Sequence, residues 1–401
     1  MTRQTVREYA ASLRQRYQGG KRKVKKRILD ELCETTGMHR KSAIRLLNEG
    51  RGPRAPTSRG RPRRYGPEVA QPLARVWEAG DRMCGKLLAP VLPELVDALE
   101  RHGELALDPE VRQRLLQVSP STIDRLLQRY KRRGLRQPRL KRPRSSGLKA
   151  LVPLRTWSEW GATPVGSVQA DLVLHCGEST EGFYLATLCA IDVATGWTEL
   201  QPVWGMSQEK VIAALHLVSR RLPFKLQALH TDNGSEFINH KLLAWCRRER
   251  VSFTRGRGYR KNDQAYVEQR NWQTVRRLVG YDRLSSKEAL NLLEHLYACL
   301  RLQGNFFRPV RKLIGKERLG ARVVKHYDEP RTPYQRLLAS GSLGQEERVR
   351  LAEVYAAINP EALRLRIEWL QRRLWHLGQE EGRMTSRVWV TLLMRQRSPV
   401  R

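Results

Sequence analysis

The segment LHTDNGSEF, residues 229–237, decides how the middle of this chain is interpreted, because it places an acid where a strand ends. Residues 224–229 are largely apolar, and an Asn-Gly pair supplies the turn that follows them. Residues 236–248 repeat apolar side chains at helical spacing, which predicts an amphipathic helix. Asp232 is therefore expected at the carboxyl end of a strand, where α/β sheets bind their ligands.

Two further acids lie in segments of comparable character. Asp171 belongs to SVQADLVLH, residues 167–175, which is typical of a buried strand. Glu268 belongs to KNDQAYVEQRNW, residues 261–272, which predicts a helix capped by its Asn or Asp. Between Asp232 and Glu268 there are 35 residues. A lone Asp-Asn-Gly is usually a turn and a lone Glu a solvated residue, but three acids matching in type, spacing and context favour a catalytic site.

HTDNGSEF and KNDQAYVEQ resemble the signatures of the D,D-35-E triad of retroviral-type integrases and bacterial insertion-sequence transposases. The resemblance implies that Asp171, Asp232 and Glu268 are both the catalytic residues and the metal ligands. It implies two Mg²⁺ or Mn²⁺ ions per site, with Asp171 bridging both and each other acid holding one. Carboxylates suit these hard cations, and two such ions stabilise the attacking and leaving oxygens of a phosphodiester. A metal-activated water would cut the element's end, and the exposed 3′-OH would attack target DNA.

The order of the predicted elements resembles the RNase H-like fold. Strands are expected at 167–175, 182–192, 197–203, 224–229 and 251–254, with helices at 208–221, at 236–248 and around Glu268. We therefore predict an α/β catalytic core over residues 151–285, built as a five-stranded mixed sheet with flanking helices.

The composition favours a nucleic acid as partner. Lys and Arg number 75 against 40 Asp and Glu among 401 residues, so double-stranded DNA is the expected polyanion. The sequence shows no apolar run long enough to span a bilayer and no segment typical of a signal peptide, which favours a cytoplasmic, nucleoid-associated protein over a membrane-surface protein. Six scattered cysteines without a C-x-x-C pair predict buried free thiols and no structural zinc.

Residues 1–50 predict a helix-turn-helix DNA-binding domain. Apolar residues at helical spacing lie on both sides of Thr36-Gly37, which indicates two helices joined by a turn. The second helix would present five residues to the major groove: His39, Arg40, Lys41, Ser42 and Arg45. An ordinary helical hairpin with a charged solvent face is the alternative.

Two basic segments are interpreted as linkers. Residues 51–66 are rich in Arg, Pro and Gly, and Arg59 and Arg61 lie in an RGRP sequence that resembles an AT-hook core for the minor groove. A generic linker that touches phosphates is the alternative. Residues 134–150 are basic and without an acid, and would join the DNA readers to the catalytic core.

Residues 67–133 predict a second helical DNA-binding domain. Ser119-Pro120 begins a helix as N-cap and first helical residue, with apolar residues on both sides of it. Its candidates for contact with DNA are Ser121, Thr122 and Arg125. A helix that packs on its neighbours is the alternative.

Further DNA contacts are expected inside the core. The basic, Gly-rich stretch 255–261 precedes Glu268 and predicts a loop that closes over DNA. Gln264 and Asn271 share a helix face with Glu268, so they would orient its carboxylate or contact DNA. Arg276 is a candidate phosphate contact, with a solvated helix face as the alternative. The predicted contacts of this region are Lys261, Gln264, Asn271 and Arg276.

Residues 286–401 predict a helical C-terminal region. Its last part repeats apolar residues at spacings of four and three, which forms an a/d seam: Leu363, Ile367, Leu370, Leu374 and Leu377. The seam would either mediate self-association or pack on the core. Because transposition holds two element ends together, a dimer or higher multimer is expected in either case.

These features together predict a DNA transposase or integrase that binds the ends of its mobile element and joins them to target DNA. Two alternatives stay open: a metal-dependent nuclease that cuts without joining, and a DNA-binding regulator with an inactive core. Intact carboxylates argue against the regulator. Inverted repeats beside the coding sequence would distinguish the transposase from both.

Overall fold

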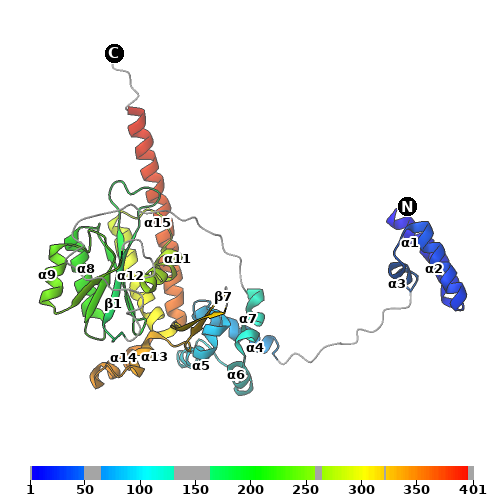
Figure 1. The fold of residues 1–401 in the computed structure, drawn as a ribbon, viewed down its shortest axis with the longest axis horizontal. Coiled ribbons are helices and arrows are strands. Elements are labelled where there is room, and N and C mark those ends of the chain that lie inside the picture. The colour runs from blue at the N-terminus through cyan, green and yellow to red at the C-terminus, as the bar shows by residue number, and fades with distance from the viewer. Residues whose placement is uncertain (1, 49–64, 131–162, 258–263, 320–321, 396–401) are drawn as a thin grey trace, which may run out of the picture. The chain divides into compact units, whose positions relative to one another are not determined.

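The computed structural model describes residues 2–48, 65–130, 163–257, 264–319 and 322–395 (Figure 1). They belong to two compact units, Met1–Arg64 and Tyr65–Arg401. The AT-hook candidates Arg59 and Arg61, the linker 134–150 and the predicted DNA contact Lys261 lie outside the described residues.

The described part of the first unit, residues 2–48, contains three helices with apolar residues at helical spacing. They are α1 (Arg3–Gly19), α2 (Arg22–Thr36) and α3 (Arg40–Asn48). Leu13, Leu32 and Leu47, one from each helix, are buried in a shared core. Gly37 ends α2 in the left-handed conformation at φ 67°, and its N–H donates to Cys33 O at 2.9 Å. The expected pair of helices with a turn between them is present, and α1 precedes it.

A five-stranded sheet lies at the centre of the second unit. Its strands are β1 (Ser167–Leu174), β2 (Ala186–Asp192), β3 (Thr198–Val203), β4 (Ala228–Thr231) and β5 (Ser252–Arg255). The spatial order is β3-β2-β1-β4-β5; the first three are antiparallel neighbours, and β4 and β5 run parallel to β1. Helix α8 (Gln208–Arg221) leads into β4, and α9 (His240–Arg248) leads into β5. This connectivity is the RNase H-like fold, so the predicted mixed sheet is confirmed.

Helices cover both faces of the sheet, which explains why its central strands are buried on both sides (Figure 1). Successive side chains of β1 point to opposite faces. Val168, Ala170 and Leu172 share a core with α8 and α9, whereas Val173 shares a core with the helices on the other side. Those helices are α10 (Ala265–Arg270), η5 (Asn271–Arg276), α11 (Arg277–Val279) and α12 (Lys287–Leu302). By this alternation Asp171 belongs to the α10 side.

Among the described residues, four α-helices precede the sheet within the same compact unit. They are α4 (Pro67–Ala79), α5 (Gly85–Arg101), α6 (Pro109–Leu116) and α7 (Pro120–Leu127). Ser119 caps α7 by accepting the Thr122 N–H at 3.4 Å. Glu94 and Glu104 accept hydrogen bonds of 2.6 and 2.9 Å from Gln335 and Asn359 of the C-terminal region. These helices therefore pack on the C-terminal region and share its core.

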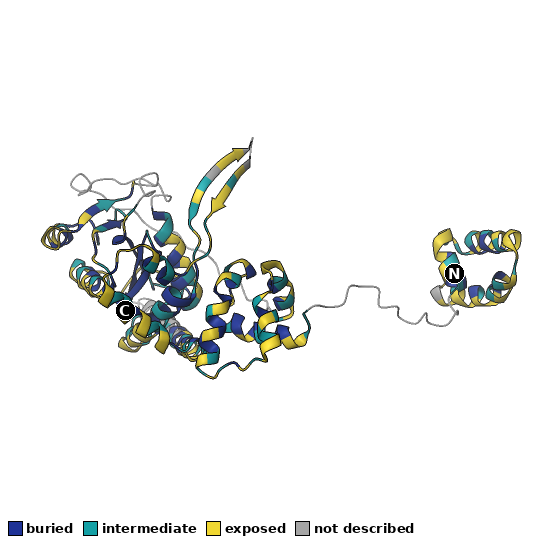
Figure 2. Ribbon diagram, turned by 90° about the horizontal axis from the view of Figure 1, so that it is seen from below, coloured by how far each residue is buried: buried dark blue, intermediate teal, exposed yellow. Residues whose placement is uncertain are grey.

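The C-terminal region carries helices, as predicted, and also a β-hairpin that the prediction lacks. After the π-helical turn η6 (Gln303–Phe307), β6 (Leu313–Leu319) pairs with β7 (Arg322–Tyr327). Figure 2 shows both strands standing away from the rest of the unit, with mostly exposed residues. Helices α13 (Pro333–Ala339), α14 (Gln345–Ala357) and α15 (Pro360–Arg395) follow. The hairpin is polar and lacks a long apolar alternation, so the sequence gives it a weak strand signal.

Helix α15 buries its apolar seam inside the chain. Ile367, Leu370 and Leu374 are buried in one core with residues of α12. Of the two alternatives for the seam, the structure shows packing on the core. These three residues are therefore not available to a second copy of the chain.

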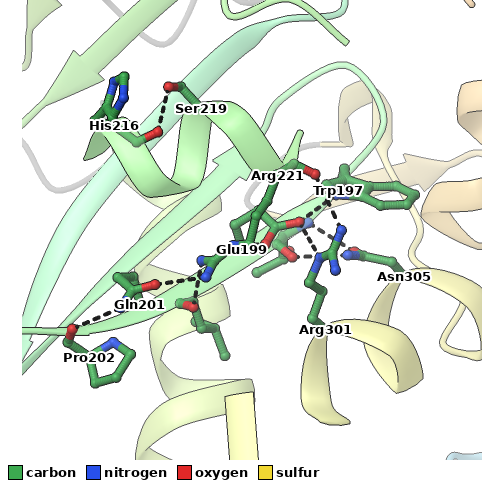
Figure 3. Close-up of polar contacts among 11 residues, drawn as sticks. Trp197, Glu199, Gln201, Pro202, His216, Ser219, Arg221, Arg301 and Asn305 are labelled. Atoms are coloured by element: carbon green, nitrogen blue, oxygen red, sulfur yellow. Dashed lines mark hydrogen bonds and ion pairs between the residues drawn. The ribbon is translucent and has the colours of Figure 1, made fainter. Parts of the chain in front are cut away.

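A buried ion network holds β3 at the edge of the sheet (Figure 3). Glu199 is 0% exposed, and its carboxylate pairs with Arg301 Nε at 2.7 Å and with Arg221 Nε at 3.2 Å. Trp197 Nε1 donates to the same carboxylate at 3.0 Å. Arg221 also donates to Gln201 Oε1 at 2.7 Å. The network ties β3 to the end of α8 and to α12.

Candidate active site

Asp171 lies on β1, on the face of the sheet that α10 and η5 cover. It is 6% exposed. Asn271 Nδ2 donates to Asp171 Oδ2 at 2.7 Å, and the Leu172 N–H donates to Asp171 Oδ1 at 2.9 Å. These bonds fix the orientation of the carboxylate.

Asp232 directly follows β4, and the parallel register of β4 with β1 brings it level with Asp171. Gln169 pairs with His230 in that register. Two residues further along each strand are Asp171 and Asp232. The Gly234 N–H donates to Asp232 Oδ1 at 3.0 Å, which closes the turn expected from the sequence. The structure therefore places the two predicted aspartates level with each other on adjacent strands, Asp171 within β1 and Asp232 just after β4.

Glu268 lies on α10, the helix that crosses the Asp171 face of β1. The Val267 N–H donates to Gln169 Oε1 at 3.3 Å, and Asn271, at the start of η5, reaches Asp171. Glu268 itself is exposed. The helix changes from α to π winding at Asn271, and π segments are frequent at functional sites. Asn271 does orient a carboxylate, but that carboxylate belongs to Asp171, which the sequence does not reveal.

The described part of the chain contains no group of three or more His, Cys, Asp or Glu placed to hold a metal ion. The three predicted ligands are thus not assembled. Their chemistry nevertheless fits Mg²⁺ or Mn²⁺, because all three are carboxylates. Asp171 and Asp232 also fit by position, and Glu268 lies on the helix that crosses the same face of β1.

Two other titratable residues close to the site have structural roles. His175, just after β1, is fully buried and hydrogen-bonded to Thr187 Oγ1 at 2.7 Å. Burial and the nearby Arg276 lower the pKa of its imidazole to about 3, so it is neutral at physiological pH. Asp192 caps the turn after β2 by accepting the Thr195 N–H at 2.8 Å, and burial raises the pKa of its carboxyl.

Three of the predicted DNA contacts of the core, Gln264, Asn271 and Arg276, lie among the described residues and are held within the core. Gln264 and Asn271 are both less than a tenth exposed. Arg276 is half-buried, donates to Leu174 O at 2.9 Å and lies 4.8 Å from the ring centroid of Tyr281. Contact of these residues with DNA stays a prediction.

The two helices predicted to bind the DNA major groove, α3 and α7, carry polar residues on their exposed faces. On and before α3 the exposed residues are His39, Arg40, Lys41, Ser42 and Arg45. Arg40 also pairs with Asp30 of α2. On α7, Ser121 and Arg125 are exposed and Thr122 is half-buried. DNA binding by either helix stays a prediction.

Comparison with known protein families supports the assignment of the central fold. A model of the integrase core domain matches residues 162–261. The chain belongs to the DDE integrase/transposase superfamily. Over 329 residues it is 45% identical to the "Uncharacterized protein y4rM" of Sinorhizobium fredii (strain NBRC 101917 / NGR234), covering 82% of this chain and 94% of that protein. It therefore belongs to the same family as y4rM.

Shorter or more distant likenesses involve viral proteins. The Pro-Pol polyprotein of feline foamy virus is 28% identical over 89 residues, which are 22% of this chain and 7% of the polyprotein. The HTLV-2 integrase catalytic core domain in complex with magnesium, in a dimeric form, is 16% identical; the match covers 37% of this chain and 92% of that one, with a TM-score of 0.29. The catalytic core domain of BIV integrase is 20% identical; the match covers 44% and 95%, with the same TM-score.

Among the helices that the structure describes, none combines the length and the apolar character that crossing a membrane requires.

Proposed function

We propose that this chain is a DNA transposase or integrase. It would bind the ends of its mobile element, cleave phosphodiester bonds there with divalent metal ions, and join the freed 3′-OH to target DNA. The observation that carries the proposal is the register of β1 and β4, which brings Asp171 level with Asp232 in an integrase core. Helix α10 adds Glu268 from the same side of the sheet.

The residues have distinct roles in this proposal. Asp171 would hold both Mg²⁺ or Mn²⁺ ions, and Asp232 and Glu268 would hold one each. Bound there, the two ions would stabilise the charge that develops on the attacking and leaving oxygens of the phosphodiester. Asn271 keeps the Asp171 carboxylate in one orientation through its 2.7 Å hydrogen bond. The exposed Glu268 side chain would turn inward and complete the ligand set when substrate and metal bind.

Double-stranded DNA is the proposed partner, both at the element ends and at the target. A formal net charge of +35 supports binding to a polyanion, and the exposed residues of α3 are candidates for reading the ends. Self-association into a dimer or higher multimer is part of the proposal, because two element ends must be held together. The α15 seam would not supply that contact, since it packs on α12.

Strand transfer by the full chain tests the proposal. The purified protein, with Mg²⁺ or Mn²⁺ and DNA carrying the sequences that flank its coding region, should yield joined products. Asp171→Asn, Asp232→Asn and Glu268→Gln should each reduce cleavage and joining at least about 1,000-fold, because each removes transition-state stabilisation of several kcal/mol. Glu209→Gln on α8, an exposed glutamate paired with Lys241, is the matched control and should keep full activity.

The outcomes separate the candidate functions. Joined products that disappear in the three variants would establish the transposase or integrase. Cleavage without joining by the unaltered chain would favour the nuclease, and binding of the ends without either reaction would favour the regulator. Normal activity in any of the three variants would show that the triad is wrongly assigned.

A further inference from the structure

An open cleft of about 540 Å³ lies beside the helix that carries Glu268. Its walls are α10 and η5, the start of α5, the turn between β2 and β3, and the foot of the β6–β7 hairpin. Among the described residues that line it, six are cationic and none is acidic. The cations are Lys86, Arg270, Arg308, Arg311, Lys312 and Lys325.

Arg270 is a buried cation that has no carboxylate partner among the described residues. It is 4% exposed, and the one hydrogen bond that those residues offer its side chain runs from Nη2 to Gly196 O at 3.3 Å. An arginine guanidinium stays charged at neutral pH, and the like charge of Arg308 acts on it. A buried guanidinium facing another cation is unfavourable unless an anion meets it.

The surroundings of Arg270 leave the cleft positive and open. Arg308 and Arg277 share the single carboxylate of Asp81, so these three groups keep a net positive charge. Helix α5 begins at the cleft, and its N-terminal end adds positive potential. Gly196 has φ +81°, and a Cβ there would lie 3.1 Å from Val310 and 3.8 Å from Arg270. A glycine therefore keeps space beside the guanidinium.

We propose that this cleft binds the sugar-phosphate backbone of DNA, with Arg270 as the phosphate contact at its base. The choice of DNA over another phosphate compound rests on the proposed function. Gln269 and Gln273 line the cleft and follow Glu268 on the same helix, so a strand in the cleft passes beside the third acid. The exposed Lys86 and Lys325 are placed for neighbouring phosphates of that strand.

Cys84 offers a direct readout, because it is exposed and lines the cleft. The full chain is alkylated with N-ethylmaleimide in the presence and absence of a short DNA duplex, and each modified cysteine is quantified by peptide mass spectrometry. Duplex DNA should slow alkylation of Cys84 severalfold. Cys299 on α12 is half-buried and does not line the cleft, so it is the internal reference and should react at an unchanged rate.

The Arg270→Gln variant distinguishes a ligand contact from a structural residue. It should weaken duplex binding about tenfold, because one charge-assisted hydrogen bond is lost, and should therefore reduce protection of Cys84 at subsaturating duplex. The slope of log affinity against log salt should fall by about one, as for one phosphate contact. The Tm should stay unchanged or rise, because an unpaired buried charge is removed. Arg247→Gln, at an exposed arginine of α9, is the matched control.

A structural role for Arg270 would instead lower the Tm and leave the salt slope unchanged, which would overturn the proposal. The double variant Lys86→Gln/Lys325→Gln changes exposed side chains and should reduce Cys84 protection without a change in Tm. Unchanged protection in that double variant would also count against the cleft.

Two further results would overturn the proposal. One is alkylation of Cys84 at an unchanged rate under saturating duplex. The other is equal protection by inorganic phosphate or ATP, which would assign the cleft to a small phosphate compound. The assay needs neither metal nor chemistry, so it is repeated with Glu268→Gln. In Glu268→Gln, Cys84 should stay protected while strand transfer is lost. In the unaltered chain, protection without strand transfer would refute the proposed function alone, and strand transfer without protection would refute the cleft alone.

Discussion

Glu199 and Arg270 are both buried charges beside the central sheet, and their surroundings are opposite. Glu199 lies between Arg221 and Arg301, so its charge is compensated within the chain (Figure 3). Arg270 faces Arg308 and a backbone carbonyl, and its charge is directed at a cleft. The first network is closed and holds three elements together. The second is open, so its charge is available to a ligand.

His175 shows a third solution for a buried ionisable group. Like Arg270, His175 is buried near an arginine, which is Arg276. Its imidazole is nevertheless neutral, because the pKa falls to about 3. Arg270 cannot respond in this way, since an arginine guanidinium stays charged at neutral pH. A buried ionisable group therefore points to a ligand where neither an ion partner nor proton loss removes its charge.

The closed network predicts the largest effect on stability. Glu199→Gln leaves two arginines around a neutral amide, and the free energy of unfolding should fall by about 3 kcal/mol. The side chains of Arg221 and Arg301 are 35% and 32% exposed, so water can rehydrate them in part. The expected loss of free energy is therefore at the lower end of the range for a broken buried ion pair. Urea unfolding measures the change. Glu209→Gln, in an exposed pair, is the control and should leave the midpoint unchanged. An equal result for both variants would show that the Glu199 network does not hold β3.

We expect the neutral His175 to have a smaller effect on the free energy of unfolding, and this effect depends on pH. Its imidazole has a pKa of about 3 in the folded chain, below the ordinary value of 6.5, so between these values the unfolded chain binds the additional proton. The stability is therefore full above pH 6.5 and is lost as the pH falls toward 3. At pH 5 the loss is about 2 kcal/mol.

Urea unfolding at pH 7.5 and pH 5 measures that loss in the unaltered chain and in His175→Asn. The unaltered chain should lose about 2 kcal/mol more than the variant between the two pH values, because only the unaltered chain has the imidazole that becomes protonated on unfolding. Equal losses would mean that His175 is not a buried, neutral group in the folded chain.

Local patterns predict the core well, because its strands and helices are set by residues close in sequence. The predicted helix 208–221 has the bounds of α8, Gln208–Arg221. The helix after β4 begins at His240 rather than Glu236, because Asn239 caps it by accepting the Leu242 N–H at 2.8 Å. Asp171 and Asp232 lie level with each other because of the register of β1 and β4 in the sheet. The resemblance to the RNase H-like fold already implies that sheet.

The cleft could not be predicted, because its character depends on residues distant in sequence. Arg270 is one of 75 Lys and Arg residues, and nothing in its local sequence shows that it is buried against Gly196 and Arg308. The contact of Asn271 with Asp171 spans 100 residues and depends on how α10 crosses β1. The exposure of the Glu268 side chain likewise depends on how α10 packs on the sheet.

We expect Asp81→Asn to have the smallest effect, an increase in duplex affinity, whereas Arg270→Gln should decrease that affinity. Asp81 has φ 60°, a left-handed conformation that Asn tolerates, so the backbone should not change. The variant removes the carboxylate shared by Arg277 and Arg308 and makes the cleft more positive. Duplex affinity should rise about threefold, roughly 0.7 kcal/mol, and the gain should shrink at high salt. Fluorescence anisotropy at two salt concentrations measures both, with Asp97→Asn, at an exposed aspartate of α5, as the control. Impaired folding does not produce tighter binding, so a gain would support the electrostatic account, whereas weaker binding would mean that Asp81 orders the cleft instead of limiting its charge.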